Sequence, residues 1–171
     1  MILSHEKMEK IFPDYHARFT MPPEAKEEDI PVYRACRTRM LERASFLNSY
    51  EENGFQVPAG LEEDAPEAYS LSTYMKLRDI KRFVASDSRY QPPLALAKGI
   101  TAGCCGVCSP SKIWKTANET APEFKNKKKW NSHVDWWLYQ DARPWEHFEV
   151  IDYEAEKQRL SDQRGEQRPA P

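Results

Sequence analysis

The sequence predicts an α+β fold, a single domain in which a largely antiparallel central sheet is flanked by a few helices. The chain has 171 residues, the usual size of one domain. Short alternating or continuous apolar segments predict strands, and two segments with helical spacing of their apolar residues predict helices. The expected strands lie near 31–37, 68–74, 94–101, 132–139 and 147–151, and the expected helices near 4–12 and 76–86.

The first part of the chain predicts a helix, an arm and a strand. Ser4 is a good N-cap for a short amphipathic helix that Pro13 ends. Residues 20–31 are charged and interrupted by prolines, which is typical of a linker or a surface arm without a core face. Residues 30–36 then alternate as in a strand and put Arg34 on the same face as two small apolar residues. Arg34 is therefore either a rim residue that extends to water or a fixed cation aimed into a cleft.

The middle of the chain predicts a strand that leads into a helix. Residues 68–74 are rich in aromatic and hydroxyl side chains, and the apolar residues of 76–86 recur at helical spacing. Residues 94–101 form a short apolar run of strand length. Residues 102–131 are polar and contain glycines, so we expect a long loop that is a lid, a binding loop or a mobile segment.

Residues 132–139 predict the clearest strand of the chain. One face carries apolar side chains and is expected to join the core, whereas the other carries His133, Asp135, Trp137 and Tyr139. The spacing of His133 and Asp135 suits a base with its orienting carboxylate, or two metal ligands. The interpretation that we favour is a hydrogen-bonded polar face on an edge strand.

The chain divides into three expected regions. Residues 1–29 form the N-terminal helix and charged arm, residues 30–151 the core, and residues 152–171 a polar tail. From about Glu154 the tail is expected to start as a helix and to fray.

Composition and charge exclude several classes of function. Charged residues make up 30% and hydrophobic residues 40%, as in globular domains. Lys and Arg number 25 against 27 Asp and Glu, so a nucleic-acid partner needs a local basic patch. The longest apolar runs are far shorter than the roughly 20 residues of a transmembrane helix. The N-terminus lacks the pattern of a secretory signal, so we expect a cytoplasmic protein without a membrane partner.

The four cysteines leave two interpretations open. Residues 105–108 form a CxxC, the spacing with which two thiolates hold one zinc ion or form a redox pair. Zinc binding by Cys104, Cys105 and Cys108, with His133 as a fourth ligand, is one interpretation. No second CxxC or HxxxH lies nearby, so we favour reduced cysteines in a glycine-rich turn.

Aromatic and basic residues near the C-terminal strands predict a binding surface for a protein or a nucleic acid. Bases stack on aromatic rings while lysines contact phosphates, and tryptophans also anchor protein interfaces. A run of lysines is equally common in solvated loops. The candidate partner-binding residues are Lys127, Lys128, Lys129, His133, Asp135, Trp137 and Trp145.

Two short motifs and their order along the chain resemble the ADP-ribosyltransferase superfamily. The motifs are Tyr33-Arg34 on the first expected strand and Leu71-Ser72-Thr73-Tyr74 on the second. The resemblance implies an NAD-using enzyme in which Arg34 holds the phosphates and Ser72 and Thr73 shape the nicotinamide site. It also implies that Tyr74 stacks on the cofactor. The late acidic residue of the superfamily corresponds either to Glu149 or to Glu154 and Glu156, which have ExE spacing.

The chemistry of this family suits such residues, because cleavage of the nicotinamide–ribose bond builds positive charge that a carboxylate stabilises. Paired guanidinium donors suit a pyrophosphate. Outside the resemblance, Arg34 is interpreted as a surface strand charge, and Ser72 and Thr73 as an N-cap of the next helix.

The C-terminal segments 133–139 and 144–149 also resemble short bacterial and phage proteins without an assigned activity, which favours a toxin or defence setting. The competing hypothesis is a non-catalytic binding protein that uses the Trp, Tyr and Lys surface.

Overall fold

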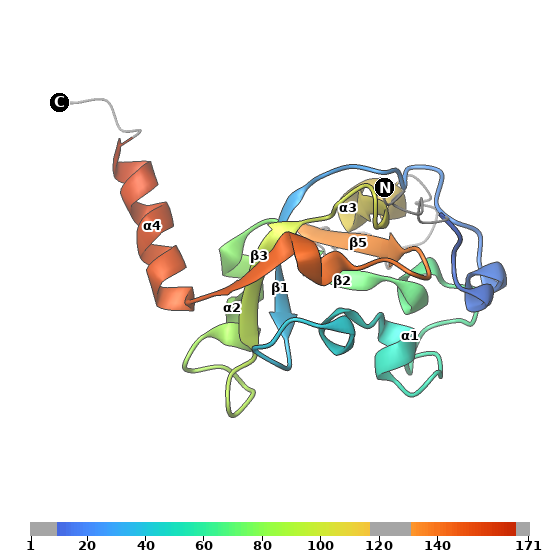
Figure 1. The fold of residues 1–171 in the computed structure, drawn as a ribbon, viewed down its shortest axis with the longest axis horizontal. Coiled ribbons are helices and arrows are strands. Elements are labelled where there is room, and N and C mark those ends of the chain that lie inside the picture. The colour runs from blue at the N-terminus through green and yellow to red at the C-terminus, as the bar shows by residue number, and fades with distance from the viewer. Residues whose placement is uncertain (1–9, 117–130, 167–171) are drawn as a thin grey trace, which may run out of the picture.

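The computed structural model describes residues 10–116 and 131–166, and these form an α+β domain built on a six-stranded antiparallel sheet (Figure 1). The strand order is β4-β5-β2-β1-β3-β6, and every pairing is antiparallel. The predicted fold class is confirmed. The strands are β1 (Pro31–Cys36), β2 (Leu71–Tyr74), β3 (Ala95–Ile100), β4 (Gly106–Pro110), β5 (His133–Leu138) and β6 (Phe148–Ile151).

Helices surround the sheet and connect its strands. The α-helices are α1 (Ser49–Glu52), α2 (Leu77–Val84), α3 (Ser111–Thr116) and α4 (Tyr153–Glu166). The 3-10 helices are η1 (Asp14–Arg18), η2 (Arg43–Phe46), η3 (Pro66–Tyr69) and η6 (Pro144–His147). The helix predicted near 76–86 is α2, which buries Leu77, Ile80 and Val84 against the sheet. Of the helix predicted near 4–12, residues 4–9 lie outside the described residues and residues 10–12 have no regular structure.

The sheet consists of two three-stranded ladders. β1 pairs with β3 along its whole length, from Pro31 to Cys36. In the part of the chain that the structure describes, β1 pairs with β2 only at Tyr33 and Tyr74. Beyond that pair the two strands separate, and the gap between them contains Arg34.

Both faces of β5 are buried. Trp136 packs in one apolar cluster with Val32 and Val134, and Trp137 packs in another with Tyr69. Both tryptophans are 0% exposed. The expectation that this is an edge strand is therefore wrong, because β4 and β2 flank β5, whereas the expected hydrogen bonding of its polar face is present at Asp135.

The segment expected to be a long loop contains β4 and α3. β4 pairs with β5 on one side, and on the other side the main chain of Lys26 pairs with Cys108. The arm at 20–29 is thus attached to the sheet. Gly106 is required in β4, because a Cβ there would collide with the carbonyl oxygen of Trp137.

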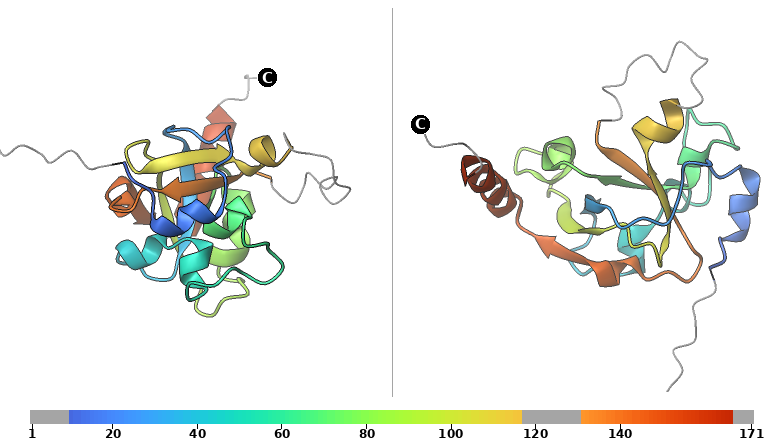
Figure 2. Two further views of the ribbon diagram at one scale, coloured as in Figure 1. Left: turned by 90° about the vertical axis from the view of Figure 1, so that its right-hand side faces the viewer. Right: turned by 90° about the horizontal axis from the view of Figure 1, so that it is seen from above.

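α4 begins directly after β6 and points away from the body of the domain (Figures 1 and 2). Tyr153 and Glu156 in its first turns are buried against the sheet, while most of the later residues are exposed. The tail expected to fray from about Glu154 is helical to Glu166. None of the helices in the described ranges has the length and apolarity to cross a membrane.

Candidate functional site

A cavity of about 170 Å³ lies where β1 and β2 separate. It contains three of the four residues predicted to bind the cofactor, Arg34, Ser72 and Tyr74. Thr73 points to the opposite face, where it is 0% exposed and its hydroxyl donates to the carbonyl of Val134 at 3.0 Å. The remaining lining residues are Ala35, Arg37, Glu52, Phe83, Tyr90 and Leu94.

The Arg34 guanidinium is a fixed cation at the back of this cavity. Its Nε donates to the carbonyl of Ser45 at 2.8 Å, its Nη1 to that of Ser72 at 2.9 Å, and its Nη2 to that of Leu47 at 3.1 Å. Glu52 Oε1 lies 3.5 Å from Nη2. Burial lowers the pKa of this guanidinium. The interpretation of Arg34 as a surface charge is therefore wrong. Its guanidinium N–H groups donate to main-chain carbonyls and are not available to bind phosphates.

A second cavity of about 550 Å³ adjoins the first, and the two share Arg37 and Leu94. Arg37 and Arg39 are both exposed and bring two cations to it. Of the three late glutamates predicted to be catalytic, Glu154 lines this cavity. The two cavities together form a cleft that runs from Arg34 to Glu154, here called the Arg34 cleft.

The structure does not bring the other two late glutamates to the Arg34 cleft. Glu149 is exposed on β6, where it pairs in register with Lys98. Glu156 accepts hydrogen bonds from Tyr33 Oη at 3.0 Å, Lys98 Nζ at 3.2 Å and Arg159. Burial acts to raise the pKa of Glu156, but the hydrogen bonds from Arg159, Lys98 and Tyr33 outweigh it and hold that pKa below its usual value. Glu156 therefore anchors α4 to the sheet.

The sequence analysis missed Glu52, whose carboxylate faces Arg34 in the smaller cavity. α1 positions Glu52, and a capping box starts that helix: Asn48 Oδ1 accepts from the Glu51 main-chain N–H at 2.8 Å. An Asn followed by a Glu three positions later is a sequence signal for a helix start. The pair Asn48 and Glu51 carries this signal in the sequence, and the helix that it starts ends at Glu52.

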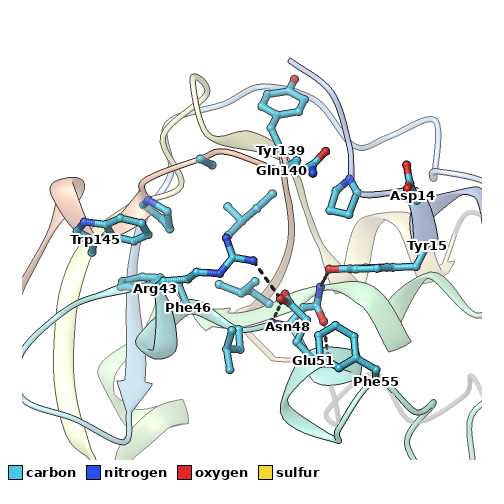
Figure 3. A pocket seen from close by; sticks show the side chains of 16 residues that line it. Asp14, Tyr15, Arg43, Phe46, Asn48, Glu51, Phe55, Tyr139, Gln140 and Trp145 are labelled. Carbon is cyan, nitrogen blue, oxygen red and sulfur yellow. Dashed lines mark hydrogen bonds and ion pairs between the residues drawn. The ribbon is translucent and has the colours of Figure 1, made fainter. Parts of the chain in front are cut away.

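A third cavity, of about 280 Å³, is lined in part by residues of the segment 43–52, which also contains Glu52 (Figure 3). Its walls include the rings of Tyr15, Phe46 and Trp145. Arg43 and Glu51 form an ion pair across 3.7 Å, and Asn48 Nδ2 donates to Tyr15 Oη at 2.8 Å. Four polar groups of this cavity thus bond in two pairs, and the 43–52 segment contributes Arg43, Asn48 and Glu51 to this cavity and Glu52 to the Arg34 cleft.

Asp135 is the centre of a buried polar network. Its carboxylate accepts hydrogen bonds from Ser70 Oγ at 2.6 Å, from Trp114 Nε1 at 2.8 Å and from Ser111 Oγ. Ser111 Oγ also contacts His133 Nδ1, and burial lowers the pKa of His133. The Ser111 hydroxyl is 0% exposed, so no substrate reaches it. The network stabilises the join between α3, β5 and the start of β2.

Two of the predicted partner-binding residues are buried and do not form a surface. Asp135 and Trp137 are buried at 1% and 0% exposure, which is a correction to their predicted role. His133 is partly buried, and Trp145 lines the cavity of Figure 3. Residues 127–129 lie outside the described residues.

The cysteine cluster differs from the predicted zinc ligands. Cys104 Sγ lies 3.9 Å from Cys105 Sγ and 3.7 Å from His147 Nε2. Cys108 instead contacts Thr101 Oγ1 at 3.4 Å, while His133 belongs to the Asp135 network. The CxxC spacing therefore does not define the cluster. All four cysteines are free thiols, and burial raises the pKa of Cys105 to about 12.

Comparisons of this chain with protein-family models, with curated proteins and with solved structures find no match.

Proposed function

We propose that this protein is an NAD-using enzyme of the ADP-ribosyltransferase type, with the cofactor bound in the Arg34 cleft. The observation that carries the proposal is the cavity between β1 and β2, in which Arg34, Ser72 and Tyr74 lie together. These residues come from both motifs that resemble the superfamily. The larger of the two cavities, about 550 Å³, has the size of a ligand pocket, which is typically ~300–1,000 Å³.

The proposed phosphate contacts are Arg37 and Arg39. Both are exposed, both line the larger cavity, and guanidinium groups bind phosphate oxygens through paired donors. Arg34 lines the smaller cavity, but the carbonyls of Ser45 and Leu47 hold its guanidinium, so it is not proposed to contact the phosphates. Tyr74 and Tyr90 line the smaller cavity and offer rings for stacking on the nicotinamide.

Glu52 is the proposed carboxylate beside the ribose. In the reaction, the bond between ribose C1′ and the nicotinamide nitrogen breaks, and its electron pair leaves with neutral nicotinamide. A nucleophile of the acceptor, or water, then forms the new bond to C1′ and loses its proton to solvent. Positive charge develops on the ribose in between, and the Glu52 carboxylate stabilises it. Glu154 lies in the larger cavity, where the acceptor approaches.

The first test is the melting temperature with and without millimolar NAD. A ligand present at a hundred times its dissociation constant stabilises the folded state by about 2.7 kcal/mol. For a chain of this length that corresponds to a rise of roughly 5–10 °C. The variant Arg37→Ala should lose the rise and keep the melting temperature of the free protein, because Arg37 is exposed.

The matched control is Arg143→Ala, which removes an exposed arginine that lines neither cavity of the cleft and should keep the full rise. Release of nicotinamide should fall at least about 100-fold in Glu52→Gln. The proposal fails if NAD leaves the melting temperature unchanged, or if Arg37→Ala and Arg143→Ala respond to NAD alike.

A further inference from the structure

We propose that Cys104, Cys105 and His147 form a binding site for one thiophilic metal ion of the zinc type. Their ligand atoms, two sulfurs and one imidazole nitrogen, all lie within 4.8 Å of one another. The turn that holds the cysteines and the end of η6 that holds His147 are 42 residues apart at their nearest. This site is independent of the Arg34 cleft and of the function proposed for it.

The distances agree with a tetrahedral metal centre. Zinc binds thiolate sulfur at about 2.3 Å and imidazole nitrogen at about 2.0–2.1 Å. At tetrahedral angles these bond lengths separate two sulfurs by roughly 3.8 Å and a sulfur from a nitrogen by roughly 3.6 Å. The observed separations are 3.9 Å between the two sulfurs and 3.7 Å between Cys104 Sγ and His147 Nε2. The third pair, Cys105 Sγ and His147 Nε2, lies within 4.8 Å, so an ion fits between the three atoms after side-chain adjustments that bring this pair to bonding geometry.

The main chain holds the ligands in place. The N–H of Cys105 donates to the carbonyl of Ala102 at 2.9 Å, and its own carbonyl accepts from the N–H of Tyr139 at 2.8 Å. On the other side, the His147 main chain lies directly against Gly99 of β3, where a Cβ would collide with the His147 carbonyl. Ligands on fixed segments lose little conformational entropy when they bind a metal.

The ligand set indicates which metals bind and how. Two thiolates and an imidazole favour zinc and other thiophilic transition metals over magnesium or calcium. Cys105 is buried, whereas Cys104 is exposed, so the cluster opens to solvent on the Cys104 side. Three protein ligands leave the fourth position to water or to an external ligand, as in catalytic rather than structural zinc sites.

The proposal is tested by titration of the reduced, metal-free full chain with Co²⁺, followed by competition with Zn²⁺. We expect one equivalent of Co²⁺ to bind with a thiolate-to-cobalt charge-transfer band, and Zn²⁺ to displace it. Cys104→Ser and His147→Gln should each weaken binding by more than about 100-fold, since loss of an outer partner of a ligand alone costs 10–100-fold. Cys104 is exposed, so the metal-free Cys104→Ser protein should melt at the wild-type temperature.

Cys108→Ala is the matched control, because Cys108 completes the CxxC but lies outside the cluster. It should bind Co²⁺ as the wild-type chain does. The absence of a charge-transfer band in the wild-type chain overturns the proposal. So does a His147→Gln protein that binds Co²⁺ as tightly as the wild-type chain, or a band that is lost in Cys108→Ala while that protein still melts cooperatively.

Discussion

Replacement of Arg34 by Met should destabilise the protein strongly, because the methionine keeps an apolar stem but removes the cation. Arg34 is 5% exposed, and three carbonyls, those of Ser45, Leu47 and Ser72, accept its hydrogen bonds. A hydrogen bond from a charged group contributes about 1.5–3 kcal/mol, and a buried carbonyl left without a partner costs about 1–3 kcal/mol. Burial of the neutral methionine avoids the cost of desolvating a cation, and this offsets part of the lost hydrogen-bond energy.

We therefore expect the free energy of unfolding to fall by about 3–5 kcal/mol, from the lost charged hydrogen bonds and the carbonyls left without a partner, less the desolvation cost of the cation. For a chain of this length the melting temperature should drop by roughly 10 °C. Urea denaturation measures the free energy of unfolding and thermal denaturation measures the melting temperature, both followed by circular dichroism. Arg37→Met, three positions along the chain and exposed, is the control and should change stability by less than about 0.5 kcal/mol. An Arg34→Met protein within about 1 kcal/mol of the wild type would refute the reasoning.

Two further predictions concern buried titratable groups. Asp135→Asn should lower the free energy of unfolding by about 2–3 kcal/mol in urea denaturation, because a neutral amide has a single acceptor oxygen for the three donors that the two carboxylate oxygens accept. The exposed Glu149→Gln is its control, and equal stability of the two variants would contradict the role of the network. Burial lowers the pKa of His16 to about 4 from 6.5, so the unfolded chain takes up a proton first as the pH falls. Stability should therefore decrease by about 3 kcal/mol between pH 6.5 and pH 4. His16→Phe should remove that part of the pH dependence of the melting temperature, and an unaltered pH profile would argue against it.

Local patterns in the sequence predicted the strands whose side chains alternate or are continuously apolar. β5 is the clearest example, because Val134 and Trp136 alternate with polar and aromatic residues. β4 was missed, since its five residues include a glycine and a proline and a single β-branched residue. It is a strand because β5 on one side and Lys26 on the other supply its main-chain hydrogen bonds, and neither is a local neighbour in the sequence.

The candidate site shows the same division between local and distant contacts. Strand alternation placed Arg34 and its neighbours correctly on β1, but it could not reveal that the carbonyls of a later segment enclose the guanidinium. The ExE spacing singled out Glu154 and Glu156 together. Glu154 lines the cleft, whereas Glu156 accepts hydrogen bonds from Tyr33 and Lys98. The two differ because neighbouring positions of a helix face different sides of the sheet.

The separation of β1 from β2 has a mechanical consequence. The two three-stranded ladders meet through the Tyr33–Tyr74 pair and through the guanidinium of Arg34, which reaches from β1 to the carbonyl of Ser72. In a fully paired ladder, many main-chain hydrogen bonds would join the two halves of the sheet, and almost any sequence can form such bonds. Here the hydrogen bonding across the seam beyond that pair depends on one side chain, while apolar contacts such as that of Val32 with Trp136 also join the two halves, so a substitution of Arg34 weakens the seam without removing a main-chain bond of either ladder.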